Sequence, residues 1–401
     1  MGLSDGAVVG ATKIVDHGSD SARWNVVLVA EGYKSSELLQ FHTDAQNFVN
    51  TLFATAPYDT LQGAINVHRL DVSSTDSGAD NPVSCGGSGN VATYFDAQFT
   101  ASICRLLTVN DTNVINAVMA NVPAWNVILV LVNTTVYGGS GGAVATFSMA
   151  PSAMEIGLHE LGHTAFGLAD EYEYWAGCGE SGHDNHPAVE PSEPNVTIDD
   201  NRMTIKWGTL ISSITPMPTT ANADCTQCDP QADPLPPGTV GAFEGAHYYH
   251  CAAYRPQYLC RMRALNNPYC AVCRRRIVET LTPFLPPKTI FKELKDAKAE
   301  KMEKFEKLEW KEFKEVKLEL KELEKVIVEI PKLKDAEGDP WLDPGIYERL
   351  ARIEASVERL AHFITQEERP NVARGALAGE PKAAAKRAAP TKAGSARKRD
   401  R

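Results

Sequence analysis

The chain lacks an apolar run of about 18 residues, so no segment has the length and composition of a membrane-spanning helix. It also lacks an excess of positive charge. Its 51 acidic side chains outnumber 40 basic ones and give a formal net charge of −11, which argues against a nucleic-acid-binding protein. A hydrophobic content of 43%, with 8% aromatic residues, is instead typical of a globular protein.

The start of the chain lacks both the basic stretch and the apolar stretch of a Sec-type signal peptide. Nine cysteines nevertheless lie between residues 85 and 273, a density typical of disulfide-bonded proteins outside the cytosol. We therefore expect a secreted or extracellular protein that leaves the cell by a route not evident in the sequence, with the cytoplasm as the alternative. The pairs Cys225-x-x-Cys228 and Cys270-x-x-Cys273 suit either disulfides, the favoured hypothesis, or one four-thiolate structural zinc site.

The most informative stretch is PSAMEIGLHELGHTAFGLADEYEYW, residues 151–175. His159 and His163 are four residues apart, so on a helix their imidazoles lie on the same face, at the spacing that a zinc ion requires. Glu160 follows the first histidine and is placed to take a proton from a metal-bound water without being a ligand. We predict one catalytic Zn²⁺ ion held by His159 and His163, with Glu160 as the general base.

A third ligand is expected just after this helix, where Gly167 provides a left-handed C-cap that turns the chain. Asp170 follows the turn and is placed to fold back onto the ion, and a carboxylate oxygen is an accepted zinc ligand. Glu171 is its rival, so the sequence leaves the third ligand open between Asp170 and Glu171.

The segment HELGHTAFGLADEY resembles the signature of the IgA-peptidase family of bacterial zinc metallopeptidases, which is related to the metzincins. Gly167 and Asp170 keep the metzincin offset from glycine to third ligand, although the glycine comes one residue later and a carboxylate replaces the third histidine. The resemblance covers roughly residues 20–285 and implies a metzincin-like α/β fold with a twisted mixed sheet, an active-site helix and protein substrates.

The same resemblance suggests roles for residues away from the zinc motif. Met262 matches the Met-turn that underlies the zinc in metzincins. Ala145, Thr146 and Phe147 lie just before the zinc helix, where metzincin-like folds have the edge strand along which an extended substrate pairs. Among the tyrosines near residue 250, Tyr254 is ranked first as a phenol that stabilises the oxyanion, ahead of Tyr248 and Tyr249.

Apolar periodicity predicts a strand–helix–strand alternation that independently favours an α/β fold. Strands are expected at 24–30, 65–72 and 125–133, and helices from about 35 to 52, near 110–121 and at 271–283. A Cys85–Cys104 bond is expected to staple the loop at 83–104. The Pro- and Gly-rich residues 176–250 are expected to form a long loop insertion that covers one side of the cleft.

We divide the chain into an N-terminal lead-in (1–19), a zinc metallopeptidase domain (20–287), a charged amphipathic helix (288–335), a second heptad helix (336–370) and a disordered basic tail (371–401). Apolar residues at alternating steps of three and four predict the heptad seams. The last 21 residues carry eight Lys or Arg against one Asp. We expect residues 288–370 to pair as a hairpin, to form a homo-oligomer or to dock onto a carrier.

The sequence thus favours a zinc-dependent endopeptidase. The alternative is a catalytically silent, peptidase-like binding or assembly module whose C-terminal helices mediate oligomerisation or tethering. The intact His159, Glu160 and His163 favour the enzyme.

Overall fold

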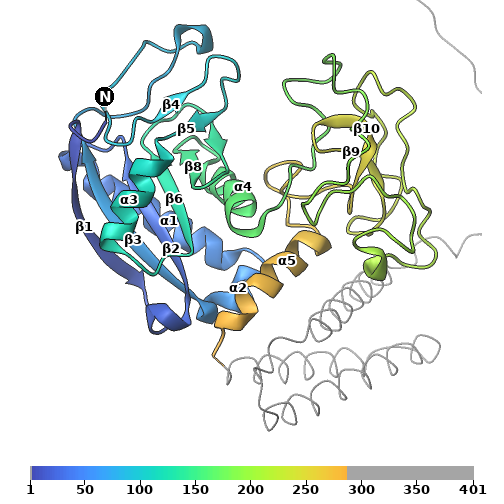
Figure 1. The fold of residues 1–401 in the computed structure, drawn as a ribbon, viewed down its shortest axis with the longest axis horizontal. Coiled ribbons are helices and arrows are strands. Elements are labelled where there is room, and N and C mark those ends of the chain that lie inside the picture. Colours follow the sequence, from blue (N-terminus) through green and yellow to red (C-terminus); the bar gives the residue numbers. More distant parts are fainter. Residues whose placement is uncertain (1, 287–401) are drawn as a thin grey trace, which may run out of the picture. The chain divides into compact units, whose positions relative to one another are not determined.

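A computed structural model describes residues 2–286, which form a mixed α/β fold (Figure 1). The predicted helices at 288–335 and 336–370 and the predicted tail at 371–401 lie outside the described residues. The strands are β1 (Gly6–Val15), β2 (Trp24–Glu31), β3 (Ile65–Ser74), β4 (Gln98–Phe99), β5 (Leu107–Thr108), β6 (Val127–Val132), β7 (Gly139–Ser140), β8 (Ala145–Ser148), β9 (Phe243–Ala246) and β10 (Tyr249–Arg255). The α-helices are α1 (Leu38–Ala54), α2 (Tyr58–Leu61), α3 (Asp111–Asn121), α4 (Ala153–Phe166) and α5 (Ala271–Leu281).

Six strands form one sheet in the order β1-β3-β2-β6-β8-β7. The four inner strands run parallel, whereas β1 and β7 pair antiparallel at the two ends. Every residue of β2 and β6 is buried, as expected for Val-rich strands covered on both faces. The predicted strands at 24–30, 65–72 and 125–133 are therefore confirmed.

Strand β1 was not predicted, because residues 1–19 were expected to be only a lead-in. Its residues alternate between half-buried and exposed, since the strand lies at the end of the sheet. Two register shifts interrupt its pairing with β3, one between Val8 and Gly10 and one between Lys13 and Val15. An edge strand with so few buried positions carries little of the apolar signal from which strands are recognised.

Helix α4 packs tightly against the sheet and against α1. Gly157 makes this approach possible, because a Cβ atom there would lie 2.8 Å from Phe48 of α1 and 2.9 Å from Phe147 of β8. Ile156, Leu158 and Leu161 are buried on the same helix. The helix that carries the HELGH sequence is therefore fixed to the core along its apolar side.

Residues 167–242 contain no strand and no α-helix. The predicted loop insertion, 176–250, is therefore confirmed up to residue 242, whereas β9 and the start of β10 lie in its last eight residues. Polar and covalent links hold residues 167–242. The Lys206 ammonium donates to the backbone carbonyls of Pro191, Glu193 and Val196, and the indole of the fully buried Trp207 donates to Gly241 O at 2.7 Å. The insertion thus has an internal framework despite its lack of regular structure.

Three disulfides are present in the described residues. The predicted Cys85–Cys104 bond is confirmed. Cys178 bonds to Cys228, and Cys225 to Cys251, so the insertion is tied to itself and to β10. These pairings correct the hypothesis of a four-thiolate site shared by the two CxxC pairs, because both cysteines of the first pair are consumed in disulfides. Cys260, Cys270 and Cys273 are free and buried, so the favoured disulfide hypothesis is confirmed for Cys225 and Cys228 and is wrong for Cys270 and Cys273.

None of the helices between residues 2 and 286 combines the length and apolar character needed to cross a bilayer.

Candidate active site

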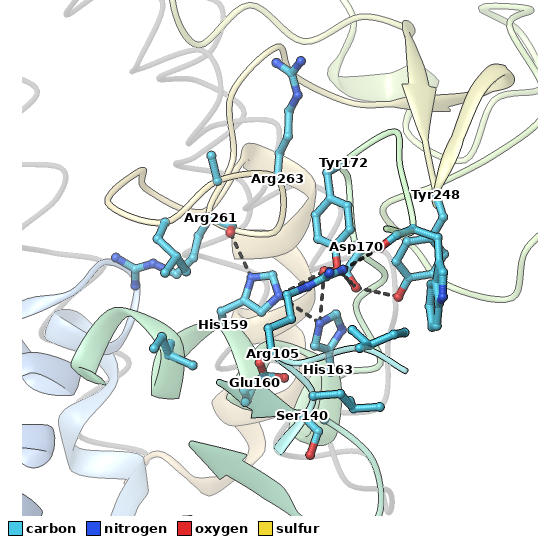
Figure 2. A pocket seen from close by; sticks show the side chains of 18 of the residues that line it. Arg105, Ser140, His159, Glu160, His163, Asp170, Tyr172, Tyr248, Arg261 and Arg263 are labelled. Atoms are coloured by element: carbon cyan, nitrogen blue, oxygen red, sulfur yellow. Dashed lines mark hydrogen bonds and ion pairs between the residues drawn. The ribbon is translucent and has the colours of Figure 1, made fainter. Parts of the chain in front are cut away.

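Helix α4 carries His159 and His163 on one face, at the wall of a cleft of about 820 Å³ (Figure 2). Their ring centroids are 4.7 Å apart and their Nε2 atoms are 3.1 Å apart. Segments 103–106, 137–142, 170–175 and 261–265 supply most of the remaining lining. The structure therefore brings the two predicted imidazoles together at a space large enough for a peptide segment.

The other nitrogen of each ring faces a backbone carbonyl. His159 Nδ1 lies 3.0 Å from Arg261 O, and His163 Nδ1 lies 2.7 Å from Leu168 O. Because a carbonyl oxygen only accepts, each Nδ1 must carry the proton and donate it. In the neutral rings both Nε2 atoms are then unprotonated, and their lone pairs point toward each other.

Asp170 completes a triangle with these two nitrogens. Gly167 ends α4 in the left-handed conformation (φ 61°), as predicted, and turns the chain back toward the helix. Asp170 Oδ1 then lies 3.0 Å from His159 Nε2 and 3.3 Å from His163 Nε2. This oxygen is buried and accepts no hydrogen bond within the described residues. Of the two rival carboxylates, Asp170 faces the histidines, whereas the Glu171 side chain approaches Cys270 and Cys273.

Two tyrosines orient the Asp170 carboxylate. The hydroxyl of Tyr248 donates to Oδ2 at 2.5 Å, and that of Tyr172 donates to the same atom at 3.0 Å. Both donors therefore use Oδ2, which leaves Oδ1 directed at the imidazoles. Figure 2 shows the two phenols on the far side of Asp170 from His159 and His163.

The three convergent atoms fit a zinc ion. A tetrahedral ion with bonds of about 2.0–2.1 Å separates its ligand atoms by about 3.3 Å, and the separations here are 3.0, 3.1 and 3.3 Å. Two neutral imidazoles and one carboxylate form a donor set that zinc accepts. The carbonyl partners of both Nδ1 atoms are the outer contacts that typically orient metal-binding histidines.

The electrostatics of these groups also favour positive charge among them. Burial lowers the pKa of His163, but the Asp170 carboxylate outweighs burial and raises it to about 9. Burial raises the pKa of Asp170, yet the imidazole of His163 holds it well below its usual value. A cation between His159 Nε2, His163 Nε2 and Asp170 Oδ1 supplies this positive charge.

A family model described as IgA Peptidase M64 matches the chain over residues 12–230 and 230–281. The chain belongs to this peptidase family. A search of curated proteins found no match. The family comprises metallopeptidases, in agreement with the resemblance carried by the HELGH segment and with the convergence of His159, His163 and Asp170.

Glu160 lies beside the ligand triangle of this peptidase. It is buried, and burial raises the pKa of its carboxyl above the usual value. Its carboxylate is within 4.8 Å of the ring nitrogens of His159 and His163. The glycine-rich segment closes over it: a Cβ on Gly139 would lie 2.6 Å from Glu160 Oε1, and one on Gly141 would lie 2.4 Å from His163 Cβ. These glycines are required for the close approach of the backbone to α4.

Met262 lies beneath α4, fully buried. A Cβ on Gly162, between the two histidines, would come 2.7 Å from Met262 Sδ. The neighbouring Arg261 provides the carbonyl that holds His159, and Met262 O accepts the Glu171 N–H at 2.8 Å. The predicted Met-turn residue thus packs against α4 at Gly162, between the two histidines in the sequence.

Tyr254, ranked first as the phenol near the chemistry, does not line the cleft. Its backbone pairs with Thr197, and its half-buried ring packs against the apolar core. Of Tyr248, Tyr249 and Tyr254, it is Tyr248 that lines the cleft. It occupies the turn between β9 and β10, where His247 (φ 54°) and Tyr248 (φ 71°) both adopt the left-handed conformation of a tight hairpin. The turn bonds to the ligand segment through His247 N–H to Asp170 O and Tyr248 N–H to Tyr172 O.

The sheet order corrects the expected substrate edge. Ala145, Thr146 and Phe147 lie in β8, which pairs with β6 on one side and β7 on the other, and all three are buried. The glycine-rich segment before β8 folds back as the short strand β7 and covers the edge that the sequence assigned to substrate. Gly139, Ser140, Gly141 and Gly142 line the cleft instead.

Sequence reasoning missed Arg105 and Tyr172. Arg105 lines the cleft, and its guanidinium donates to Trp175 O at 2.7 Å. Burial lowers the pKa of Arg105, but the Tyr172 hydroxyl and nearby acidic groups outweigh this and raise it. No spacing relative to HELGH points to a residue so far upstream, whereas Tyr172 was within the motif segment and was overlooked as a partner of Asp170.

Proposed function

We propose that the chain is a zinc-dependent endopeptidase in which His159, His163 and Asp170 hold the ion and Glu160 is the general base. The single observation that carries the proposal is the convergence of His159 Nε2, His163 Nε2 and Asp170 Oδ1 within 3.0–3.3 Å of one another. When bound, zinc supplies Lewis-acid polarisation of the peptide carbonyl and a lowered pKa for water, to about 7.

The chain's own residues then move the proton. Glu160, buried beside the ligand triangle, takes a proton from the attacking water and delivers it to the nitrogen of the leaving amine. The raised pKa of its carboxyl suits this transfer, because a carboxylate with a raised pKa is a stronger base toward water and keeps the proton until the amine receives it. Tyr172 and Tyr248 hold Asp170 so that Oδ1 stays directed at the histidines.

The shape of the cleft supports a protein substrate. The backbone of residues 139–142 forms one wall and segment 261–265 another, so an extended peptide fits between them. Arg105 provides a cationic side chain at this cleft. The placement of Met262 beneath α4 supports a metzincin-like architecture, and the three disulfides support action outside the cytosol.

The intact His159, Glu160 and His163 favour this enzyme over a silent binding module. The test compares the wild type with Glu160→Gln on an unfolded protein substrate, with metal content measured in both. We expect the variant to keep its zinc and to lose about 10²–10⁴-fold in cleavage rate. The exposed Asp59→Asn change is the matched acid-to-amide control. Full cleavage by Glu160→Gln would refute the role of Glu160.

A further inference from the structure

A second cluster of metal-binding side chains lies apart from the histidines. It consists of Glu171, Cys260, Cys270 and Cys273, all buried, with one ligand atom of each within 4.8 Å of the others. Glu171 comes from the segment after α4, and Cys260 immediately precedes the Met262 turn. Cys270 is the N-cap of α5, and Cys273 is in its first turn.

Three distances between ligand atoms in this cluster suit tetrahedral coordination. Cys260 Sγ and Cys273 Sγ are 3.8 Å apart, far longer than the bond of about 2.05 Å in a disulfide. Zinc with bonds to sulfur of about 2.3 Å separates two sulfur ligands by about 3.8 Å and a sulfur from an oxygen ligand by about 3.6 Å. Glu171 Oε1 lies 3.6 Å from Cys270 Sγ and 3.3 Å from Cys273 Sγ.

Backbone amides are arranged to support thiolates. Cys260 Sγ accepts from the N–H groups of Met262 at 3.4 Å and Cys270 at 3.3 Å. Cys270 Sγ accepts from Cys273 N–H at 3.4 Å, at the N-terminus of α5, where the helix dipole also favours negative charge. Donors placed in this way stabilise sulfur in its deprotonated, ligand form.

Glu171 also points to a missing positive charge. Asn195 Nδ2 donates to its Oε1 at 2.9 Å, but the buried Oε2 has no hydrogen-bond partner in the described part of the chain. A carboxylate buried among three sulfurs is unfavourable unless a cation or further donors compensate it. The described residues provide no Lys or Arg ion pair for Glu171.

We propose that Glu171, Cys260, Cys270 and Cys273 bind a structural zinc ion distinct from the catalytic one. A donor set of three thiolates and one carboxylate favours zinc among the common divalent ions. All four positions are filled by the protein, which is the mark of a structural and not a catalytic site. Each thiol releases its proton on coordination. The site does not depend on the proposed peptidase activity.

This ion joins α5 to the two segments, 170–175 and 261–265, that line the cleft. Glu171 follows Asp170, and its own N–H donates to Met262 O at 2.8 Å. Cys260 is two residues before Met262, and Cys270 and Cys273 anchor α5. The proposed zinc therefore fixes Asp170 and Met262 relative to each other, so its loss is expected to disturb the histidine site as well as the fold.

Cobalt(II) tests the proposal on the full chain, because only thiolate ligands give an intense sulfur-to-cobalt charge-transfer band in the near ultraviolet. After cobalt(II) is added, the metal-depleted wild type is expected to show this band. The zinc-loaded chain is expected to hold about two equivalents of zinc, about one for each site. His163→Ala is expected to keep the band and lose about one equivalent. Cys273→Ser is expected to lose the band.

Wild type and His163→Ala carry the test even if Cys273→Ser fails to fold. The proposal is overturned if folded wild type lacks the thiolate band, or if mass spectrometry shows a disulfide among Cys260, Cys270 and Cys273. A wild type that cleaves no substrate but shows the band would contradict the proposed peptidase and leave this zinc site supported.

Discussion

Asp170 and Glu171 are adjacent in the chain, yet their carboxylates face two different candidate metal clusters. Asp170 Oδ1 lies 3.0 Å from His159 Nε2 and 3.3 Å from His163 Nε2, whereas Glu171 Oε1 lies 3.3 Å from Cys273 Sγ. One short segment thus serves both the candidate catalytic centre and the proposed structural centre, which couples their geometry.

The first prediction concerns the phenols that orient Asp170. Tyr248→Phe removes the 2.5 Å bond to Oδ2, so the free zinc concentration that restores half of the activity of metal-depleted protein should rise about 10–100-fold. Tyr172→Phe removes a longer bond, of 3.0 Å, and should have a smaller effect in the same direction. Activity reconstitution against buffered zinc measures both.

Tyr249→Phe is the matched control, because this neighbouring tyrosine does not line the cleft. It should reconstitute at the zinc concentration of the wild type. If Tyr248→Phe did the same, its hydroxyl would have no part in holding Asp170 for the metal.

A second prediction concerns the glycine-rich segment. A Cβ at Gly141 would lie 2.4 Å from His163 Cβ, so Gly141→Ala must displace either the segment or α4. A displacement of about 1 Å at an active site costs about 10²-fold in rate, and we expect kcat/KM to fall by this order. Gly142→Ala meets nothing closer than 3.9 Å and should leave kcat/KM near that of the wild type.

Peptide hydrolysis by the two alanine variants, with folding checked by circular dichroism, distinguishes steric contact from general flexibility. Equal losses of kcat/KM in Gly141→Ala and Gly142→Ala would mean that mobility of the segment, and not its contact with His163, is what activity requires.

The third prediction concerns pH and stability. Burial raises the pKa of Glu31 from 4.5 to about 7, although the N–H groups of Phe95 and Ala97 donate to its carboxylate. Between these values the folded chain keeps the proton that the unfolded chain releases, so the free energy of unfolding falls as pH rises from 4.5 to about 7. The loss is on the order of 3 kcal/mol.

Urea unfolding of the full chain at about pH 5 and about pH 8 measures this loss. Glu31→Gln cannot ionise, and its free energy of unfolding should fall less than that of the wild type between the two pH values. Identical pH dependence of the two proteins would show that the amide donors keep Glu31 charged throughout.

Local signals in the sequence were enough to predict the centre of the sheet and the helix that carries HELGH. Strands β2 and β6 are continuous apolar runs, and their burial on both faces leaves few other structures possible. HELGH places two histidines by helical periodicity alone, and Gly167 marks the helix end through its backbone freedom. Each of these features depends on residues within a few positions of one another.

Features that depend on distant contacts were not predictable in this way. Tyr248 reaches Asp170 because a tight hairpin turn bonds to the ligand segment, a contact between residues 78 positions apart. The choice between Asp170 and Glu171 depends on which carboxylate meets the cysteines near α5. The burial of β8 depends on β7 folding back over it, for which the glycines before β8 gave an ambiguous signal.

The central claim is that an ion held by His159, His163 and Asp170 is required for peptide-bond cleavage. The most direct measurement is the rate at which the full chain cleaves an unfolded protein before chelation, after chelation and after zinc is restored, with His163→Ala in parallel. We predict cleavage that chelation abolishes and zinc restores in the wild type, and none at any stage in the folded variant. Undiminished cleavage by metal-depleted wild type, or by His163→Ala, would contradict the account.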